Sequence, residues 1–360
     1  MTRKRHGLAA LAAAALLASA CGNVIDAQNQ AKSGSDHGGE GKLLRVAIFG
    51  GSWEKGIRQS VITPFEKETG IRVQAEIGTS TVTLGKLRQS PDAVDVALLD
   101  SGVSETARAE KLVATLPQDK IPALPELADR AKLRDREGIW ALTMGYWALG
   151  LAYNSEKVKT PPTSWDDLWA PANAGKVAIP APATTGGLPL ALLAAGHAEA
   201  KGDTDLAPGL TKLRDLNAVS FFDSSGAASN LLQSGEAAVA AHYNSGAWPL
   251  ADQGLPIKWV APKEGALAAD SRWHVTAKAR NVEAAYKFLD FASRKQAQEG
   301  LVKTIYLAPA NTTAVIPETV RGRMPYGPDG SLDDLLYVDW EMINKNKSKW
   351  TDAWTRTVPR

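Results

Sequence analysis

Short apolar runs and amphipathic stretches alternate through most of the chain. The runs 43–49, 71–77 and 94–100 have the length of buried strands, and the stretch 57–70 repeats apolar residues with helical spacing. Pro64 falls inside this stretch, so we expect it to kink or split the helix. Strands that alternate with helices predict β-α-β units and a mainly parallel sheet covered by helices.

A second group with the same alternation follows the long apolar stretch at 138–154. The pattern predicts, in chain order, strands at 176–180, 238–245 and 256–262 and helices at 188–200, 281–301 and 334–358. The chain is therefore predicted to hold two similar α/β units. On the last helix an apolar stripe is predicted to pack against the second unit; it consists of Trp340, Ile343, Trp350 and Trp354.

Two strand-end loops repeat the same composition. The segment "VAIFGGSWEKG" at 46–56 ends its strand with paired glycines, and "APATTGG" at 181–187 follows a strand in the second unit. Neither loop has the G-x-x-x-x-G-K-[ST] or G-x-G-x-x-G spacing of phosphate-binding loops. Ligands of such sheets bind beyond the carboxyl ends of the strands. The loops therefore predict the rim of a ligand pocket rather than a nucleotide site.

The N-terminus has the pattern of a secretory leader. Basic residues at 3–5 precede an apolar run at 8–20, which is too short to span a bilayer as a helix. The segment "LLASAC" resembles a bacterial lipobox with Cys21 as the lipidated residue, although Ala18 stands where leucine is commoner. The alternative is an ordinary signal peptide in which Cys21 has no role. The polar, glycine-rich remainder of 21–42 predicts a flexible tether.

Charge and cysteine usage exclude several classes of protein. The whole chain has a net charge of +2; without the predicted signal peptide at 1–20, 38 basic residues face 39 acidic ones, which gives −1. A near-neutral surface argues against nucleic-acid binding. Cys21 is the only cysteine, so we expect no disulfide framework, thiolate metal site or cysteine nucleophile. We expect no cofactor and no metal, and interpret His242 and His274 as structural.

Several segments, taken in order, resemble the extracellular solute-binding proteins of ABC importers, and most closely the spermidine/putrescine-binding branch. They include "FEKETGIRV", "DVALLDSG", "PTSWDDLW", "GKVAIPAPATTGG", "LLQSGEAAVAAHYNSGAW", "NVEAAYKFLDFA" and "DWEMINKNKSKWTDAW". The resemblance implies an α/β, two-lobed periplasmic-binding-protein type II (Venus-flytrap) fold, in which each lobe is a mainly parallel sheet flanked by helices. The implied lobes are 43–143 plus 274–305, and 144–273 plus 306–360.

The resemblance also implies a mechanism and partners. A small solute would bind between the lobes and stabilise a closed state that an ABC permease with its ATPase recognises. The protein would be a monomer and not an enzyme, anchored by its lipid at the extracytoplasmic face of the bacterial cell membrane. The polyamine branch implies an amine ligand. The acidic residues of that branch are missing from "APATTGGL", which favours a less cationic solute, for example a zwitterion.

Four predicted ligand-site residues lie at strand ends of the first lobe. Ser52 and Trp53 follow the first strand, where Trp53 would form an aromatic wall; the alternative is a turn whose indole packs on the core. Asp100 and Ser101 end the third strand. A carboxylate at this position would hold a ligand ammonium or, alternatively, cap the following helix.

The second lobe supplies further predicted ligand-site residues. Thr184, Thr185 and Gly186 precede a helix, where hydroxyl and N–H groups either bind an anion or only cap the helix. Tyr243 and Asn244 end a strand and have counterparts in the family.

The crossings between the lobes supply the remaining candidates. Trp273 with Asp270 would pair an aromatic wall with a carboxylate, which suits an amine. The alternative for Trp273 is core packing between the lobes. Tyr146 and Trp147 are candidates at the first crossing on the same grounds.

Two other functions fit the same patterns less well. A secreted α/β hydrolase acting on a phosphate or glycan substrate would need a catalytic motif, and the chain has neither G-x-S-x-G nor H-E-x-x-H. A surface binding module without a transport role is the second alternative.

Overall fold

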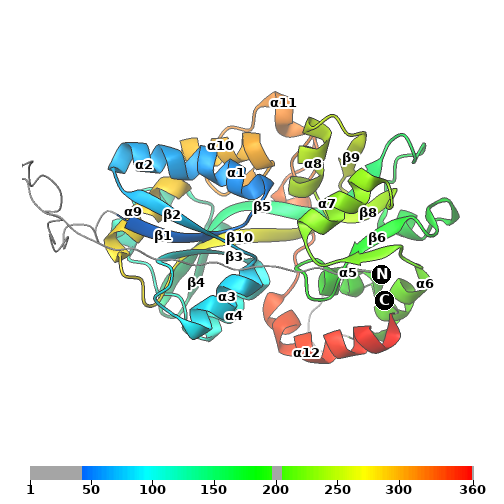
Figure 1. The fold of residues 1–360 in the computed structure, drawn as a ribbon, viewed down its shortest axis with the longest axis horizontal. Helices are drawn as coiled ribbons and strands as arrows, with labels where there is room; N and C mark the ends of the chain where they lie inside the picture. Colours follow the sequence, from blue (N-terminus) through cyan, green and yellow to red (C-terminus); the bar gives the residue numbers. More distant parts are fainter. Residues whose placement is uncertain (1–42, 197–204, 359–360) are drawn as a thin grey trace, which may run out of the picture. The chain divides into compact units, whose positions relative to one another are not determined.

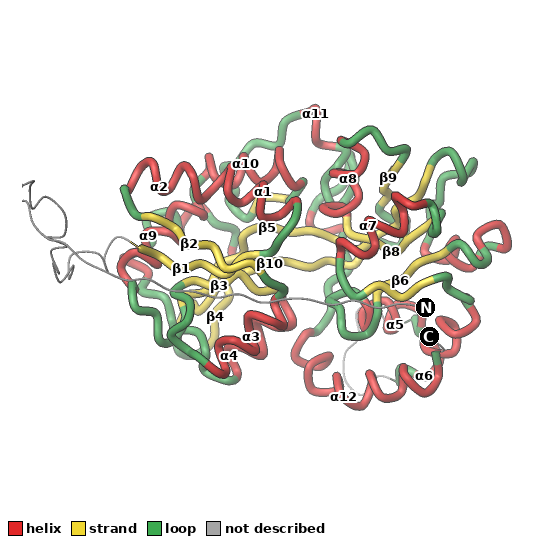
Figure 2. The backbone as a smooth tube through the Cα atoms, in the orientation of Figure 1, coloured by secondary structure: helices red, strands yellow, loops and turns green. Residues whose placement is uncertain are grey.

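The computed structural model describes residues 43–196 and 205–358, which lie within one compact unit, Gly38–Arg360. The predicted signal peptide, Cys21 and the tether fall outside the described residues. In the part of the chain that is described, no helix combines the length and apolar character needed to cross a membrane. This part has a mixed α/β architecture (Figures 1 and 2).

The described residues place eleven strands in one sheet. Its main path runs through β2 (Arg72–Ile77), β1 (Leu43–Ile48), β3 (Val96–Asp100), β10 (Leu267–Val275), β5 (Gly138–Asn154), β8 (Val239–Tyr243), β6 (Val177–Pro180) and β7 (Ser220–Phe222). β1 pairs in parallel with β2 and β3, and β6 pairs in parallel with β7 and β8. The predicted parallel sheets are thus confirmed as two blocks, a first block β2-β1-β3 and a second block β8-β6-β7.

Two central strands join the blocks by antiparallel pairing. β10 pairs with β3 and β5, and β5 pairs with β8. Figure 1 shows β5 and β10 between the two blocks. β5 has 17 residues and also pairs with three short strands, β4 (Lys132–Asp135), β9 (Ile257–Val260) and β11 (Ala308–Pro309). The sequence pattern does not predict β10, because polar residues interrupt its apolar ones although the whole strand is buried.

Helices cover both faces of each block (Figure 1). One face of the first block carries α1 (Ser52–Ile57), α2 (Thr63–Thr69) and α10 (Lys295–Ile305), the other carries α3 (Ser80–Gln89) and α4 (Ser101–Ala109), and α9 (Val282–Ser293) packs on β10. One face of the second block carries α7 (Ser225–Ser234) and α8 (Asn244–Asp252), and the other carries α5 (Gly187–Ala194), α6 (Ala207–Asp215) and α12 (Trp340–Thr357). α11 is Glu318–Arg321, and short 3-10 helices lie at Gln118–Lys120, Leu124–Glu126, Asp129–Ala131, Trp165–Trp169, Pro171–Asn173 and Leu332–Asp334.

The first helical stretch is split at its proline, as predicted. Residues Arg58–Ile62 form a π-helix between α1 and α2, and Pro64 stands in the first turn of α2. The proline ring lacks an N–H and crowds the carbonyl four residues earlier, so regular α-helical bonding does not continue through it. Gly70 then ends α2 with a φ of 71°, a conformation that glycine adopts without strain.

Three predicted elements have other bounds in the structure. The helix expected over 281–301 is two helices, because Arg294 between them has an extended backbone with ψ of 152°. The C-terminal helix starts at Trp340, later than predicted, because the Asp339 side chain caps it by accepting a backbone N–H of its first turn at 3.0 Å. The strand expected over 238–245 ends at Tyr243, and α8 starts directly after it.

Candidate functional site

A cavity of about 800 Å³ lies at the carboxyl ends of the parallel strands. All six of these strands contribute to its lining, through Phe49 after β1, Ile77 of β2, Asp100 of β3, Pro182 after β6, Phe222 of β7 and Tyr243 of β8. Residues of α12 complete the lining. Both blocks therefore form walls of one space, as expected for a ligand site at strand ends.

A row of aromatic rings forms one wall of the cavity. Phe49 meets Trp53 edge to face with ring centroids 5.3 Å apart, Trp53 meets Trp147 at 6.2 Å, and Trp147 meets Tyr243 at 4.6 Å. The row runs from the end of β1 to the end of β8, so it links the two blocks. Trp53 is only 8% exposed and therefore belongs to the core as well as to the wall. Aromatic faces of this kind attract cationic groups.

The Asp100 carboxylate lines the cavity and is held by hydrogen bonds from the central strand β10 and from the second block. Ser271 donates to its Oδ1 at 3.0 Å, and Thr185 of the second block donates to its Oδ2 at 3.3 Å. Ser271 in turn accepts a hydrogen bond from Trp147 Nε1 at 3.1 Å, so the carboxylate and the aromatic wall are fixed together.

Asp100 was predicted either to hold a ligand ammonium or to cap the following helix, and its hydrogen bonds and pKa distinguish these two roles. Asp100 occupies the N-cap position of α4, but its side chain makes no capping hydrogen bond, which excludes the helix-cap alternative. Burial raises the pKa of Asp100 to about 6, although the hydrogen bonds from Ser271 and Thr185 oppose this. Above that pH, a negative charge faces the cavity.

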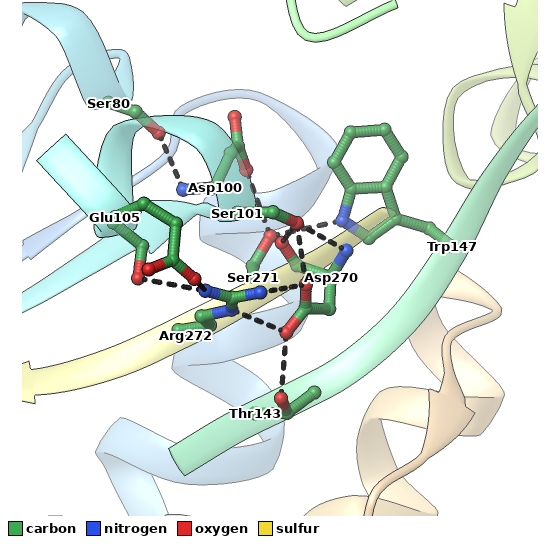
Figure 3. Close-up of polar contacts among 10 residues, drawn as sticks. Ser80, Asp100, Ser101, Glu105, Thr143, Trp147, Asp270, Ser271 and Arg272 are labelled. Atoms are coloured by element: carbon green, nitrogen blue, oxygen red, sulfur yellow. Dashed lines mark hydrogen bonds and ion pairs between the residues drawn. The ribbon is translucent and has the colours of Figure 1, made fainter. Parts of the chain in front are cut away.

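A buried polar network next to the cavity joins β3, α4, β5 and β10 (Figure 3). Asp270 accepts hydrogen bonds from Ser101 at 2.5 Å and Thr143 at 2.7 Å, and it pairs with Arg272 at 2.8 Å. Arg272 also pairs with Glu105 at 2.5 Å. Burial opposes ionisation of Asp270, but the charge and hydrogen bonds of Arg272 outweigh burial and lower the pKa of Asp270. The charge of this carboxylate is therefore compensated inside the protein.

The thirteen predicted ligand-site residues divide into two sets. Those that line the cavity are Ser52, Trp53, Asp100, Trp147, Thr184, Thr185 and Tyr243. Those that do not line it are Ser101, Tyr146, Gly186, Asn244, Asp270 and Trp273. Members of the second set lie outside the lining of this cavity, for reasons that differ from residue to residue.

Strand geometry and core packing explain the two aromatic members of the second set. Trp273 is 1% exposed and packs edge to face on Phe288 at 5.3 Å, so it belongs to the core, which was the alternative interpretation. Tyr146 precedes Trp147 on β5, and successive side chains of a strand point to opposite faces. Because Trp147 lines the cavity, Tyr146 faces away from it.

Asn244 and Gly186 determine how backbone segments are arranged around the cavity. The buried Asn244 amide accepts the backbone N–H of Ala148 at 3.0 Å and donates to the carbonyl of Tyr306 at 2.9 Å. It thereby joins β5 to the segment that follows α10. A Cβ on Gly186 would lie 3.1 Å from the Tyr243 hydroxyl, so glycine lets this part of the wall come close.

Three residues that the sequence pattern does not indicate also line the cavity. Asp223 follows β7, a strand of three residues that is too short to predict. Lys347 and Trp340 belong to α12, and they share one face of it with Asn344. The stripe on this helix was expected to pack on the second unit, and at Trp340 this is wrong: its ring lies over Gly102 of the first block. The helical spacing of Trp340 and Lys347 is the signal that links them.

The two buried histidines are neutral. Desolvation lowers the pKa of His242 and of His274 to about 3. The His274 ring stacks on Trp140 with centroids 5.7 Å apart. Within residues 43–196 and 205–358, no group of three or more His, Cys, Asp or Glu side chains could hold a metal ion.

Comparison with known proteins gives a consistent set of matches. Residues 60–321 match the sequence profile of the family described as bacterial extracellular solute-binding protein. The putrescine-binding periplasmic protein of Escherichia coli is 25% identical over 331 residues, which cover 85% of this chain and 89% of that protein. The gamma-aminobutyric acid-binding protein of Pseudomonas aeruginosa is 26% identical over 319 residues, which cover 84% and 87%.

A solved structure supports the same fold. An ABC transporter substrate-binding protein from Bradyrhizobium japonicum aligns with a TM-score of 0.76 at 17% sequence identity. The alignment covers 88% of this chain and 99% of that one. At this identity the likeness concerns the fold alone.

Proposed function

Because this chain belongs to the bacterial extracellular solute-binding proteins, we propose that its cavity captures a small polar solute carrying an amine and delivers it to the permease of an ABC importer. The chain is a solute-binding protein with polyamine-binding relatives, and those relatives are substrate-binding proteins rather than enzymes. The relatives compared above are named for putrescine and for gamma-aminobutyric acid, and both compounds carry a primary amine.

The proposal that the solute has an amine rests mainly on the Asp100 carboxylate. It lines the cavity, and within the described residues no lysine, arginine or histidine forms an ion pair with it. An ammonium group bound here would gain a charge-assisted hydrogen bond and the adjacent aromatic faces of Trp53, Trp147 and Tyr243. Asp270, by contrast, already has Arg272 as its partner.

Capture would act between two lobes, 43–143 plus 274–305 and 144–273 plus 306–360. Two hydrogen bonds join these proposed lobes across the cavity. Thr185 donates to Asp100 at 3.3 Å, and Asn344 donates to the carbonyl of Gly102 at 2.7 Å. A ligand that touches both lobes only when they are closed shifts the equilibrium toward the closed state, which is the form a permease would recognise.

We further propose that Cys21 is acylated after removal of residues 1–20 and that 21–42 tether the binding domain, a monomer, at the extracytoplasmic face of the membrane. The basis for this is the leader pattern and the lipobox-like segment before Cys21.

Thermal unfolding of the purified protein in a panel of solutes tests the amine proposal. We expect one or more cationic amines to raise the melting temperature, since a ligand at a hundredfold excess over its Kd adds about 2.7 kcal/mol to stability. The variant Asp100→Asn should not respond, because it lacks the charge that pairs with the ammonium. Sugars and simple carboxylates serve as controls. A response only to these controls, or an equal response of Asp100→Asn, would contradict the proposal.

A further inference from the structure

Helix α12 brings a second charge of opposite sign to the cavity. Trp340, Ile343, Asn344 and Lys347 all line the cavity, and their spacing of three and four residues places them on one stripe of the helix. Lys347 is exposed, and no carboxylate or hydrogen-bond acceptor of the described residues pairs with its Nζ. The remainder of the stripe is engaged with the protein.

This stripe of α12 lies on the side of the cavity where Asp100 is located. Asn344 donates to the carbonyl of Gly102 at 2.7 Å, and Gly102 stands two residues after Asp100. A Cβ on Gly102 would lie 2.7 Å from the Trp340 ring, so the helix comes as near as glycine permits. Lys347 follows Asn344 by three residues, about 4.5 Å along the helix axis. Asp100 and Lys347 therefore line one cavity, on the side where α12 contacts the first block.

We propose that the solute is a zwitterion, with its ammonium on Asp100 and its carboxylate on Lys347. This inference rests on the proposed function, because it uses the same cavity and the same ammonium position. Hydroxyl and amide groups of the second block also line the cavity and can donate to a carboxylate; they include Ser224, Ser225, Ser229 and Asn230.

A diamine is the competing ligand, because Asp223 also lines the cavity. A second ammonium would be attracted by Asp223 but repelled by Lys347. Asp223 is exposed, and no hydrogen bond of the described residues joins its side chain to β3 or α4. Lys347 lies on a helix that is bonded to the first block beside Asp100. The observations therefore favour the zwitterion.

Titration calorimetry with linear compounds of matched chain length tests this inference. The probes are ω-amino acids, diamines, monoamines and monocarboxylates, each with three to six carbons. We expect the wild-type protein to bind an ω-amino acid at least tenfold more tightly than the monoamine or the diamine of equal length. Lys347→Gln should lower the affinity for the ω-amino acid at least tenfold and leave the affinity for the monoamine within twofold.

Lys345→Gln is the matched control, because Lys345 is an exposed lysine of the same helix that does not line the cavity. Lys347→Glu should reverse the preference in favour of the diamine. Two outcomes would overturn the zwitterion: equal or tighter binding of the diamine by the wild type, or an unchanged affinity of Lys347→Gln for the amino acid. In either case, amine binding that depends on Asp100 would still uphold the proposed function. Binding of none of the amines would overturn both.

Discussion

Asp100 is half-buried at the cavity, where burial opposes its charge and no ion pair with a described residue compensates it. Asp270, in the network beside it, has a buried arginine as its partner. Asp100 and Asp270 are close in the fold but differ in whether an ion pair within the protein compensates their charge. The pKa of Asp270 is lowered and that of Asp100 is raised to about 6, so of these two only Asp100 combines an uncompensated charge with access to a ligand.

The raised pKa of Asp100 makes a prediction about stability without ligand. A carboxyl group whose pKa rises from 3.8 to about 6 on folding stabilises the protein fully below about pH 4, and this contribution is lost as the pH rises through 6. Asp100→Asn removes the buried charge. We therefore expect it to increase the free energy of unfolding by about 1–3 kcal/mol at pH 7.5 and to change it little at pH 4.

Urea unfolding of the ligand-free wild type and of Asp100→Asn at both pH values is the measurement. Asp223→Asn is the control, because Asp223 is an exposed carboxylate of the same cavity. A lower free energy of unfolding for Asp100→Asn at pH 7.5 would contradict this prediction, because it would mean that the charged carboxylate stabilises the fold.

At the scale of elements, strand alternation decides which side chains reach the ligand. Trp147 of β5 lines the cavity and donates to Ser271, whereas its neighbour Tyr146 points to the opposite face. Where β5 pairs with β10, the register shifts between Ser271 and Arg272 because β5 carries one extra residue, Met144, so side chains of β5 on the two sides of this bulge do not follow one simple alternation.

Two adjacent residues of β5 provide a matched test of this assignment. We expect Trp147→Phe to weaken amine binding about tenfold, because it removes the best cation–π surface and the hydrogen bond to the serine that holds Asp100. Tyr146→Phe should leave the affinity unchanged. Calorimetric titration with the amine identified by thermal unfolding gives both values. Equal losses in the two variants would show that alternation on β5 does not separate wall from core.

The alternation of apolar runs was sufficient to predict the two parallel blocks and the gathering of strand ends at one cavity. Pro64 and Gly70 also allowed the sequence to predict where the first helical stretch is split and where it ends. What the pattern lacks is information on long-range partners. A buried strand with Asp270 and Arg272 in it looks polar until the ion pair between them is known. The helical spacing links Lys347 to Trp340, but it does not indicate that this side of the helix faces a cavity built by other elements.

For the whole molecule, the important feature is that both blocks and α12 enclose one space. α12 packs against α5 and α6 of the second block, yet its first turns contact α4 of the first block through Trp340 and Asn344. Together with the Thr185–Asp100 hydrogen bond, these contacts join the proposed lobes across the cavity. A solute that adds an ion pair at Asp100 and contacts on α12 would stabilise this joined arrangement over a separated one.

Small-angle X-ray scattering tests this account most directly. The protein is measured without ligand and at saturation with the amine identified by thermal unfolding, alongside Asp100→Asn at the same ligand concentration. We predict that the radius of gyration of the wild type falls on saturation and that the variant does not change. An unchanged radius for the saturated wild type, or an equal decrease in Asp100→Asn, would contradict capture of an amine between two closing lobes.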